Sequence, residues 1–172
     1  MLVPLFAGCA SKTPDVVAAE NAMTLEKLDW SFEVEGGSKT TYTLADAKAH
    51  EMSKVIVSMF TRYPEGYVDP NLIEGTNVSW LAEGIKFTEF LEDVGAADAT
   101  RVTWYGNDAY GEEVSGVLEG DLLKDEKNVL IGWVKNKEEV LPNRSKTYVG
   151  IFGSTALTDF VSCCSLYKIV IE

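Results

Sequence analysis

Apolar and polar side chains alternate strictly from Leu28 to Glu35, and this period of two restricts the first part of the folded chain to a β-strand. Trp30, Phe32 and Val34 fall on one face of such a strand, while acidic and hydroxyl side chains fall on the other. The glycine pair at 36–37 predicts a hairpin turn, and residues 40–43 follow as the returning strand. The fold is therefore expected to begin with a half-buried β-hairpin.

Further short apolar segments predict a sheet-dominated fold. Val55–Phe60 is apolar almost without interruption, which favours a central strand covered on both faces. Other strands are expected at 101–105, 112–117, 129–134, 148–152 and 166–171. With two short helices, they predict a single α+β domain that is mainly β and contains a mixed sheet.

Two stretches carry helix signals. Thr43 and Asp46 have the spacing of a capping box, which predicts a short helix to Met52 with residues 45, 49 and 52 on its buried face. A second helix is expected at 87–94, where apolar residues recur at helical spacing before Gly95. Between these helices, residues 64–79 predict a long loop, and a loop of that length in a compact domain often has a function.

Composition excludes several classes of protein. The chain has 172 residues, of which 46% are hydrophobic and 24% charged, as expected of one globular domain with or without a tail. No apolar run reaches the roughly 18 residues that a membrane-spanning helix needs. The 15 Lys and Arg residues against 27 Asp and Glu leave a net charge of −12. A chain this acidic repels phosphate backbones, so we expect no nucleic-acid partner.

The first nine residues, MLVPLFAGC, look like the end of a bacterial lipoprotein signal. Apolar residues precede the small pair Ala7 and Gly8, and Cys9 follows them, as a signal peptidase requires. Residues 10–23 are small and polar, which predicts a tether, and residues 24–172 then form the domain. Acyl chains on Cys9 would anchor the protein to a membrane on its extracytoplasmic side, at the cell surface or in the periplasm. A chance cysteine in a frayed apolar terminus is the alternative.

The remaining cysteines, Cys163 and Cys164, are adjacent, and neighbouring cysteines rarely pair because the ring they would close is strained. We expect one buried thiol and one partly exposed thiol. The chain has one histidine, His50, and no CxxC motif, so a structural zinc site is not expected. His50 is interpreted as a surface residue that caps the end of a helix.

Two stretches together carry a family resemblance. Residues 84–96 (GIKFTEFLEDVGA), followed by 101–110 (RVTWYGNDAY), resemble the sulfite-oxidase-type molybdopterin-binding domain. The segments 129–142, 149–153 and 166–171 follow in that family's order, so the likeness covers roughly residues 79–172. The resemblance implies that domain's fold. It also implies, for a competent enzyme, a molybdenum ion held by a cysteine thiolate just after a central apolar strand.

The chain differs from that family at the position of the metal-ligating cysteine. The corresponding residues, 58–63, read SMFTRY and contain no cysteine, and the Met59 thioether brings no negative charge to a high-valent metal. We therefore expect the fold without a cofactor and a binding or accessory module rather than a competent molybdoenzyme. A minimal oxidoreductase that keeps molybdopterin, with Cys163 or Cys164 reaching the metal, is the alternative.

The candidate ligand site is a cleft between the 64–79 loop and the 106–111 turn, for a small molecule or a protein partner. Its residues are Arg62, Tyr63, Tyr105, Asp108 and Tyr110. Arg62 has the geometry to hold an anion, whereas a local salt bridge is its alternative role. Ordinary turn chemistry is the alternative for Asp108, with Tyr110 packing back on the turn.

Other features of the chain weaken the case for an enzyme. No nucleophile elbow, Walker loop, dinucleotide fingerprint or HExxH motif occurs. The aromatic residues at 67, 80, 104, 105 and 133 are expected to pack in the core and at sheet edges, with a sugar or peptide cleft as the alternative. A purely structural surface protein, without a deep pocket, is a third possibility.

Overall fold

The computed structural model describes residues 24–60, 77–108, 111–137, 139–140, 147–157 and 160–172. Its strands are β1 (Ser31–Glu35), β2 (Thr41–Thr43), β3 (Ser53–Phe60), β4 (Asn77–Lys86), β5 (Arg101–Asn107), β6 (Glu113–Glu119), β7 (Val129–Lys135), β8 (Glu139–Val140), β9 (Gly150–Gly153) and β10 (Ser165–Ile171). Its helices are α2 (Leu44–Ala47), α3 (Phe87–Asp93) and the 3-10 helix η1 (Gly120–Lys124). The predicted mainly β single domain with a few short helices is confirmed.

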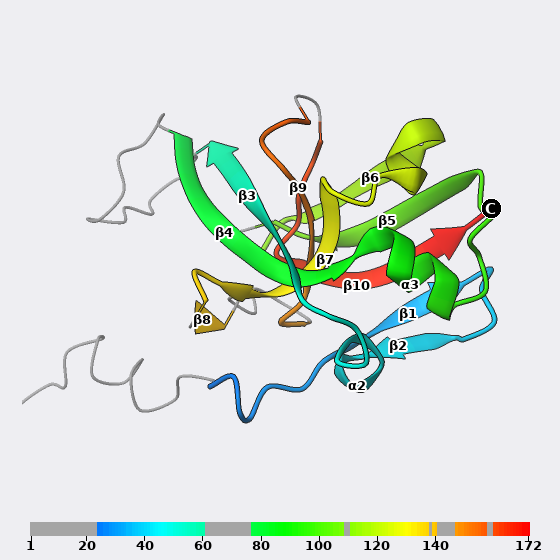
Figure 1. The fold of residues 1–172 in the computed structure, drawn as a ribbon, viewed down its shortest axis with the longest axis horizontal. Coiled ribbons are helices and arrows are strands. Elements are labelled where there is room, and N and C mark those ends of the chain that lie inside the picture. Colours follow the sequence, from blue (N-terminus) through cyan, green and yellow to red (C-terminus); the bar gives the residue numbers. More distant parts are fainter. Residues whose placement is uncertain (1–23, 61–76, 109–110, 138, 141–146, 158–159) are drawn as a thin grey trace, which may run out of the picture.

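The strands of the described ranges form two sheets (Figure 1). The first sheet has the order β2-β1-β10-β5-β6, and it is mixed because β1 runs parallel to β10 while its other pairs are antiparallel. The second sheet has the order β3-β4-β7-β8, with β9 also paired to β7, and it is antiparallel throughout. The β10 strand thus lies in the middle of the first sheet although it comes last in the chain.

The strand that is covered on both faces is β7, not Val55–Phe60. Residues 129–134 of β7 are all buried, and β7 lies between β4 and the pair β8 and β9. In contrast, β3 is an edge strand in which Val55 and Val57 are buried while Ile56 is 56% exposed. The prediction of a central strand at Val55–Phe60 was therefore wrong, because a continuous apolar run does not distinguish an edge strand with exposed aliphatic residues from a central one.

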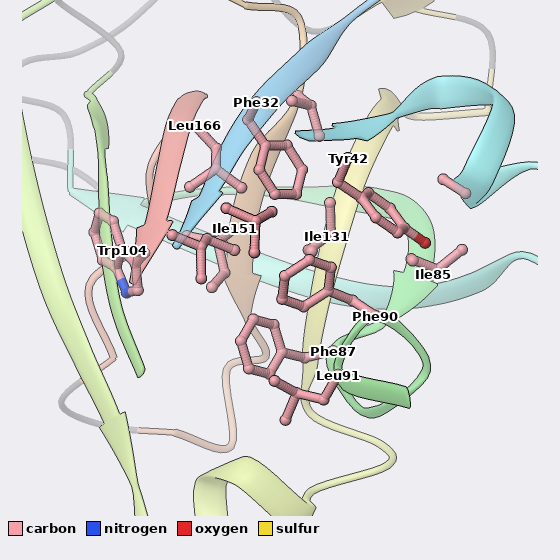
Figure 2. Packing of buried hydrophobic residues seen from close by; sticks show 14 of the residues in the cluster. Phe32, Tyr42, Ile85, Phe87, Phe90, Leu91, Trp104, Ile131, Ile151 and Leu166 are labelled. Carbon is pink, nitrogen blue, oxygen red and sulfur yellow. The ribbon is translucent and has the colours of Figure 1, made fainter. Parts of the chain in front are cut away.

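Most buried side chains belong to one core cluster, which draws on both sheets and on α3. Figure 2 shows its aromatic part, where Phe32, Tyr42 and Phe90 meet. Tyr42 and Phe90 make an edge-to-face contact with ring centroids 5.1 Å apart, and Phe32 lies 5.7 Å from Phe90. Such pairs contribute about 0.5–1.5 kcal/mol beyond their burial. The amphipathic pattern of 87–94 is thus explained, because α3 packs its apolar face into this core, where it contacts β4 and β7 and where Phe90 meets the first sheet.

The capping box before α2 is confirmed, but the helix is shorter than expected. The Thr43 hydroxyl accepts a hydrogen bond from the Asp46 amide, and the Asp46 carboxylate accepts one from the Thr43 amide. Leu44 and Ala47 are buried, whereas Ala45 is exposed and Met52 is 51% exposed, so the predicted buried face was wrong. The α2 helix has one turn, so it ends before residues 49 and 52, where the expected apolar face would have continued.

The β4 strand was missed in the sequence. Its first residues, 77–79, were assigned to the long loop, and the rest of that loop lies outside the described residues. The strand was not recognised because Glu83 and Gly84 interrupt its apolar alternation at a β-bulge. Gly84 is needed there, since a Cβ would lie 1.9 Å from the carbonyl oxygen of Ile131 on the neighbouring strand. The two-residue β8 was also missed.

The Thr43–Asp46 box predicts a pH dependence of stability. Burial raises the pKa of Asp46, but hydrogen bonds from Lys39, 2.8 Å away, and Thr43 outweigh it and hold the pKa below 3.8. A depressed carboxyl pKa stabilises the fold above the unfolded-state value near 4, and this contribution is lost as the pH falls through the folded-state pKa. Asp46→Asn should lower the free energy of unfolding by about 1 kcal/mol at pH 7.

Urea titrations at a series of pH values check this prediction. The difference between wild type and Asp46→Asn should shrink as the pH falls from about 4 through the lower folded-state pKa, because Asp46 is then protonated in both states. A difference that is unchanged down to pH 2 would contradict the electrostatic account.

Candidate functional site

Two of the sequence-predicted site residues, Tyr105 and Asp108, lie in the described part of the structure. Tyr105 is half-buried on β5, on the outer face of the first sheet and in register with Lys168 and Ser115. The Asp108 carboxylate accepts a hydrogen bond from the Glu112 amide at 3.0 Å, so Asp108 closes the hairpin. Its alternative interpretation as ordinary turn chemistry is the one the contacts favour.

The other predicted site residues are outside the described residues. Arg62, Tyr63, Tyr110 and the acylation candidate Cys9 all fall there, as does most of the expected cleft between 64–79 and 106–111. Their placement as a ligand site and an anchor stays a prediction.

Both cysteines of the 163–164 pair are buried, which corrects the expectation that one of them is partly exposed. Cys163 is 0% exposed and packs so closely on β5 that a Cβ at Gly106 would lie 2.5 Å from its sulfur. Cys164 is 3% exposed and belongs to a second core cluster with Trp80 and Phe152. Two adjacent side chains can both be buried here because they point to opposite faces of the segment.

The described thiols do not fit the metal-binding role that the resemblance implies. Both side chains are buried in apolar core clusters, and burial raises the pKa of Cys163 to about 12. No group of three or more His, Cys, Asp or Glu side chains gathers at metal-binding spacing within the described ranges. We therefore derive no chemistry through a metal held by Cys163 or Cys164.

A groove of about 360 Å³ lies where β5 and β6 meet η1 and residues 156–157 and 160–161. Trp104 is 1% exposed and forms its base, while Val117 and Val161, 42% and 52% exposed, lie at its rim. Its remaining lining residues are Gly116, Leu122, Ala156, Leu157 and Phe160. The lining side chains are apolar apart from the Trp104 indole N–H, but backbone groups make about half of the lining surface polar. The volume is in the range of small-ligand sites.

Gly116 sets the base of the groove. A Cβ at this position would lie 2.4 Å from Cζ2 of Trp104, so the indole ring lies directly against the β6 backbone. Trp104 and Gly116 are register partners across the β5–β6 pair. The missing side chain lets Trp104 pack against the backbone of β6. Trp104 was expected to pack in the core or at a sheet edge, with a sugar or peptide cleft as the alternative.

The opposite wall consists of residues 154–157 and 160–161, and hydrogen bonds hold its first part. The Ser154 amide donates to the Asn128 carbonyl at 2.8 Å, and its hydroxyl donates to Asn128 Oδ1 at 2.6 Å. The Thr155 amide donates to the carbonyl of Ile56 at 2.9 Å, which ties the wall to β3. Phe160 packs on Gly153, where a Cβ would lie 2.3 Å from its ring. The described parts of this wall therefore have defined positions, and the groove is preformed.

Asn128 in turn depends on Asp125. The Asp125 carboxylate accepts hydrogen bonds from the Lys127 and Asn128 amides, both at 2.8 Å. Burial raises the pKa of Asp125, but these bonds and one from the Asn128 side chain outweigh it, so the pKa lies below 3.8. The wall therefore rests on a carboxylate that is ionised at neutral pH.

A polar cluster lies elsewhere, between β2 and α3. The Tyr42 hydroxyl donates to Asp93 Oδ2 at 2.6 Å, and His50 Nε2 is 2.8 Å from the same oxygen. Burial and the Asp93 carboxylate raise the pKa of Tyr42. His50 was expected to cap a helix end at the surface, but it is half-buried and bonds to a residue far along the chain. The cluster ties three segments together, and we assign it a structural role.

Sequence reasoning missed the groove. Trp104 was the one lining residue that it considered, as core packing or as part of a sugar or peptide cleft. The signal available was weak: Leu122, Leu157 and Phe160 belong to apolar pairs (122–123, 156–157 and 160–161) that show no strand or helix periodicity. They come together only because η1 and 154–161 pack against the same sheet edge.

Comparison with known proteins assigns no family to this chain. No protein-family model matches it, and no curated protein matches it. Within the described ranges, no helix has the length and apolarity of a membrane span. The function must therefore be argued from the groove and the sequence pattern.

Burial predicts how the two adjacent thiols react. In a Cys9→Ser variant, Cys163 and Cys164 should react with a thiol reagent at pH 8 only after denaturation, because neither sulfur meets solvent and Cys163 stays protonated. Absorbance after addition of Ellman's reagent measures this. Rapid labelling of the folded protein would contradict the burial and reopen the metal-ligand alternative.

Proposed function

We propose that this protein is a bacterial extracytoplasmic lipoprotein, anchored through Cys9, whose domain serves as a binding or accessory module. The domain is proposed to have the sulfite-oxidase-type molybdopterin-binding fold, in a divergent form without the metal-ligating cysteine. The lipoprotein-like MLVPLFAGC stretch supports the anchor, and the order of segments over residues 79–172 supports the fold.

The observation that carries the binding function is the preformed apolar groove over Trp104. Burying apolar area contributes about 25 cal/mol per Å², so a groove whose rim residue Val161 is 52% exposed gains by being covered. Among its described lining residues, the side chains are apolar and none is suited to acid–base or nucleophilic chemistry. The groove therefore suits recognition of an apolar group rather than catalysis.

A minimal molybdopterin-dependent oxidoreductase is the second candidate, and the segment order is the observation in its favour. It would need a thiolate ligand. Cys163 and Cys164 are poor choices because both are buried and the pKa of Cys163 is raised.

Binding at the groove is tested with a neutral apolar dye, N-phenyl-1-naphthylamine, whose fluorescence rises when it leaves water. Val161→Asp should weaken dye binding about tenfold, because it places a charge at the apolar rim. Met52→Asp is the matched control, since Met52 is 51% exposed and does not line the groove. Equal binding by the two variants, or no binding by the wild type, would refute a ligand function for this groove.

The anchor is tested in the native host by metabolic labelling with an alkyne fatty acid. The wild-type protein should carry the label and sediment with membranes, because acyl chains partition into lipid. Cys9→Ser should lose the label and appear in the soluble or secreted fraction. A labelled Cys9→Ser protein, or an unlabelled wild type, would argue against acylation at Cys9.

A further inference from the structure

The strand that borders the groove, β6, has one open edge. It is the last strand of the β2-β1-β10-β5-β6 sheet, and among the described strands it pairs only with β5. Figure 1 shows η1 following β6 directly, so η1 lies at the end of the strand. An open edge presents unpaired backbone amides and carbonyls, which can pair with an added strand.

The groove and the open edge belong to one surface. Gly116 and Val117 are both strand residues and lining residues, so the cavity runs alongside the β6 backbone. Val114, Gly116 and Leu118 face inward, whereas Glu113, Ser115, Val117 and Glu119 are exposed on the outer face. A strand added to β6 would therefore place every second side chain toward Trp104 and the rest over the outer face.

The groove has most room for the side chain of the added strand that lies opposite Gly116. Cross-strand neighbours have Cβ atoms about 4.5–5.5 Å apart, and glycine leaves that space empty on β6. An inward side chain at this position would meet Trp104 at the base, with Leu157 and Phe160 on the far wall. The cavity thus accepts one large apolar side chain from the added strand.

The acidic residues of β6 determine which charges an added strand should carry. Glu113 and Glu119 lie three residues on either side of Gly116 and share the outer face. Each has a neighbour within its own sheet, Tyr167 for Glu113 and Arg101 for Glu119, but a carboxylate has acceptor positions to spare. Lys or Arg side chains directly opposite would be stabilising, and acidic ones destabilising.

The same charges disfavour a second copy of this chain as the added strand. Antiparallel self-pairing centred on Gly116 would set Glu113 of each copy opposite Glu119 of the other. Each copy also carries a net charge of −12. The occupant is therefore a different, cationic chain.

We propose that β6 binds an extended peptide as an additional antiparallel strand, with a large apolar residue opposite Gly116 and Lys or Arg three positions to either side. This inference rests on the proposed binding function and names the ligand class of the same groove. The peptide's backbone bonds to the edge of β6, its apolar side chain covers Trp104, and its cationic ends face Glu119 and Glu113.

The test uses the blocked peptide KTVFVTK, labelled with a fluorophore, and fluorescence anisotropy with the full chain. Two N-methylated forms are compared, one methylated at the second, fourth and sixth residues and the other at the third and fifth. Alternate amides of a strand point to opposite sides, so one methylation pattern removes donors that face β6 and the other does not. We expect one methylated form to lose at least tenfold in affinity and the other to bind like the parent peptide.

A charge exchange fixes the orientation. In an antiparallel arrangement the last residue of the peptide faces Glu113, so Glu113→Lys should weaken KTVFVTK several-fold and prefer KTVFVTE. Glu113 is exposed on the outer face of the sheet, where its carboxylate accepts a hydrogen bond from the Tyr167 hydroxyl at 3.4 Å, so this variant should fold. A preference for ETVFVTK instead would overturn the antiparallel register.

The remaining outcomes separate this inference from the proposed function. Equal binding of both methylated peptides, or dye binding without peptide binding, would overturn strand addition while leaving an apolar-ligand groove. Failure of both the peptide and N-phenyl-1-naphthylamine to bind would overturn both proposals. A dimer in solution that Val117→Lys dissociates would show that a second copy occupies the edge and would overturn the cationic peptide.

Discussion

The parallel pairing of β1 with β10 is the constraint on which the first sheet depends. It aligns Glu33–Glu35 with Lys168–Val170, and the Lys168 ammonium lies 2.6 Å from the Glu35 carboxylate, 133 residues away along the chain. Without β10, the β1–β2 and β5–β6 hairpins would remain separate, because β10 joins both. Gly36 makes this closure possible, since a Cβ there would lie 2.2 Å from the carbonyl oxygen of Ile171. Closing so long a loop costs entropy, which the shared core repays.

This closure also determines where the candidate site lies. With β10 in the middle and β2 at one end, β6 becomes the other end of the sheet, and its edge stays open among the described strands. Trp104, on the adjacent β5, lies at one side of the core cluster in Figure 2, away from Tyr42. The groove is thus the place where the core reaches a sheet edge. A single glycine at 116 decides whether the indole ring can lie there.

Local patterns predicted much of the fold. The alternation before Gly36 gave β1, the Thr43–Asp46 spacing gave the start of α2, and the helical spacing at 87–94 gave α3. A prediction that depends on long-range pairing was wrong. The apolar run 55–60 did not reveal that β3 is an edge strand, because strand order is set by pairing partners far away in the chain. The groove was not predicted for the same reason, since nothing in the sequence around Leu122 and Leu157 indicates that they lie together. Tyr105 and Asp108 were predicted as ligand-site residues, whereas their contacts assign Tyr105 to the outer face of the first sheet and Asp108 to its hairpin turn.

The central claim is that the surface formed by β6 and the 154–161 segment recognises the ligand. An amide ¹H–¹⁵N correlation spectrum of the ¹⁵N-labelled protein, recorded while the KTVFVTK peptide is added, tests it most directly. The account predicts that the largest shift changes fall on Gly116, Val117 and Val161 and on the Trp104 indole N–H. Changes confined to the far edge of the first sheet, at β2, or to the second sheet would contradict it.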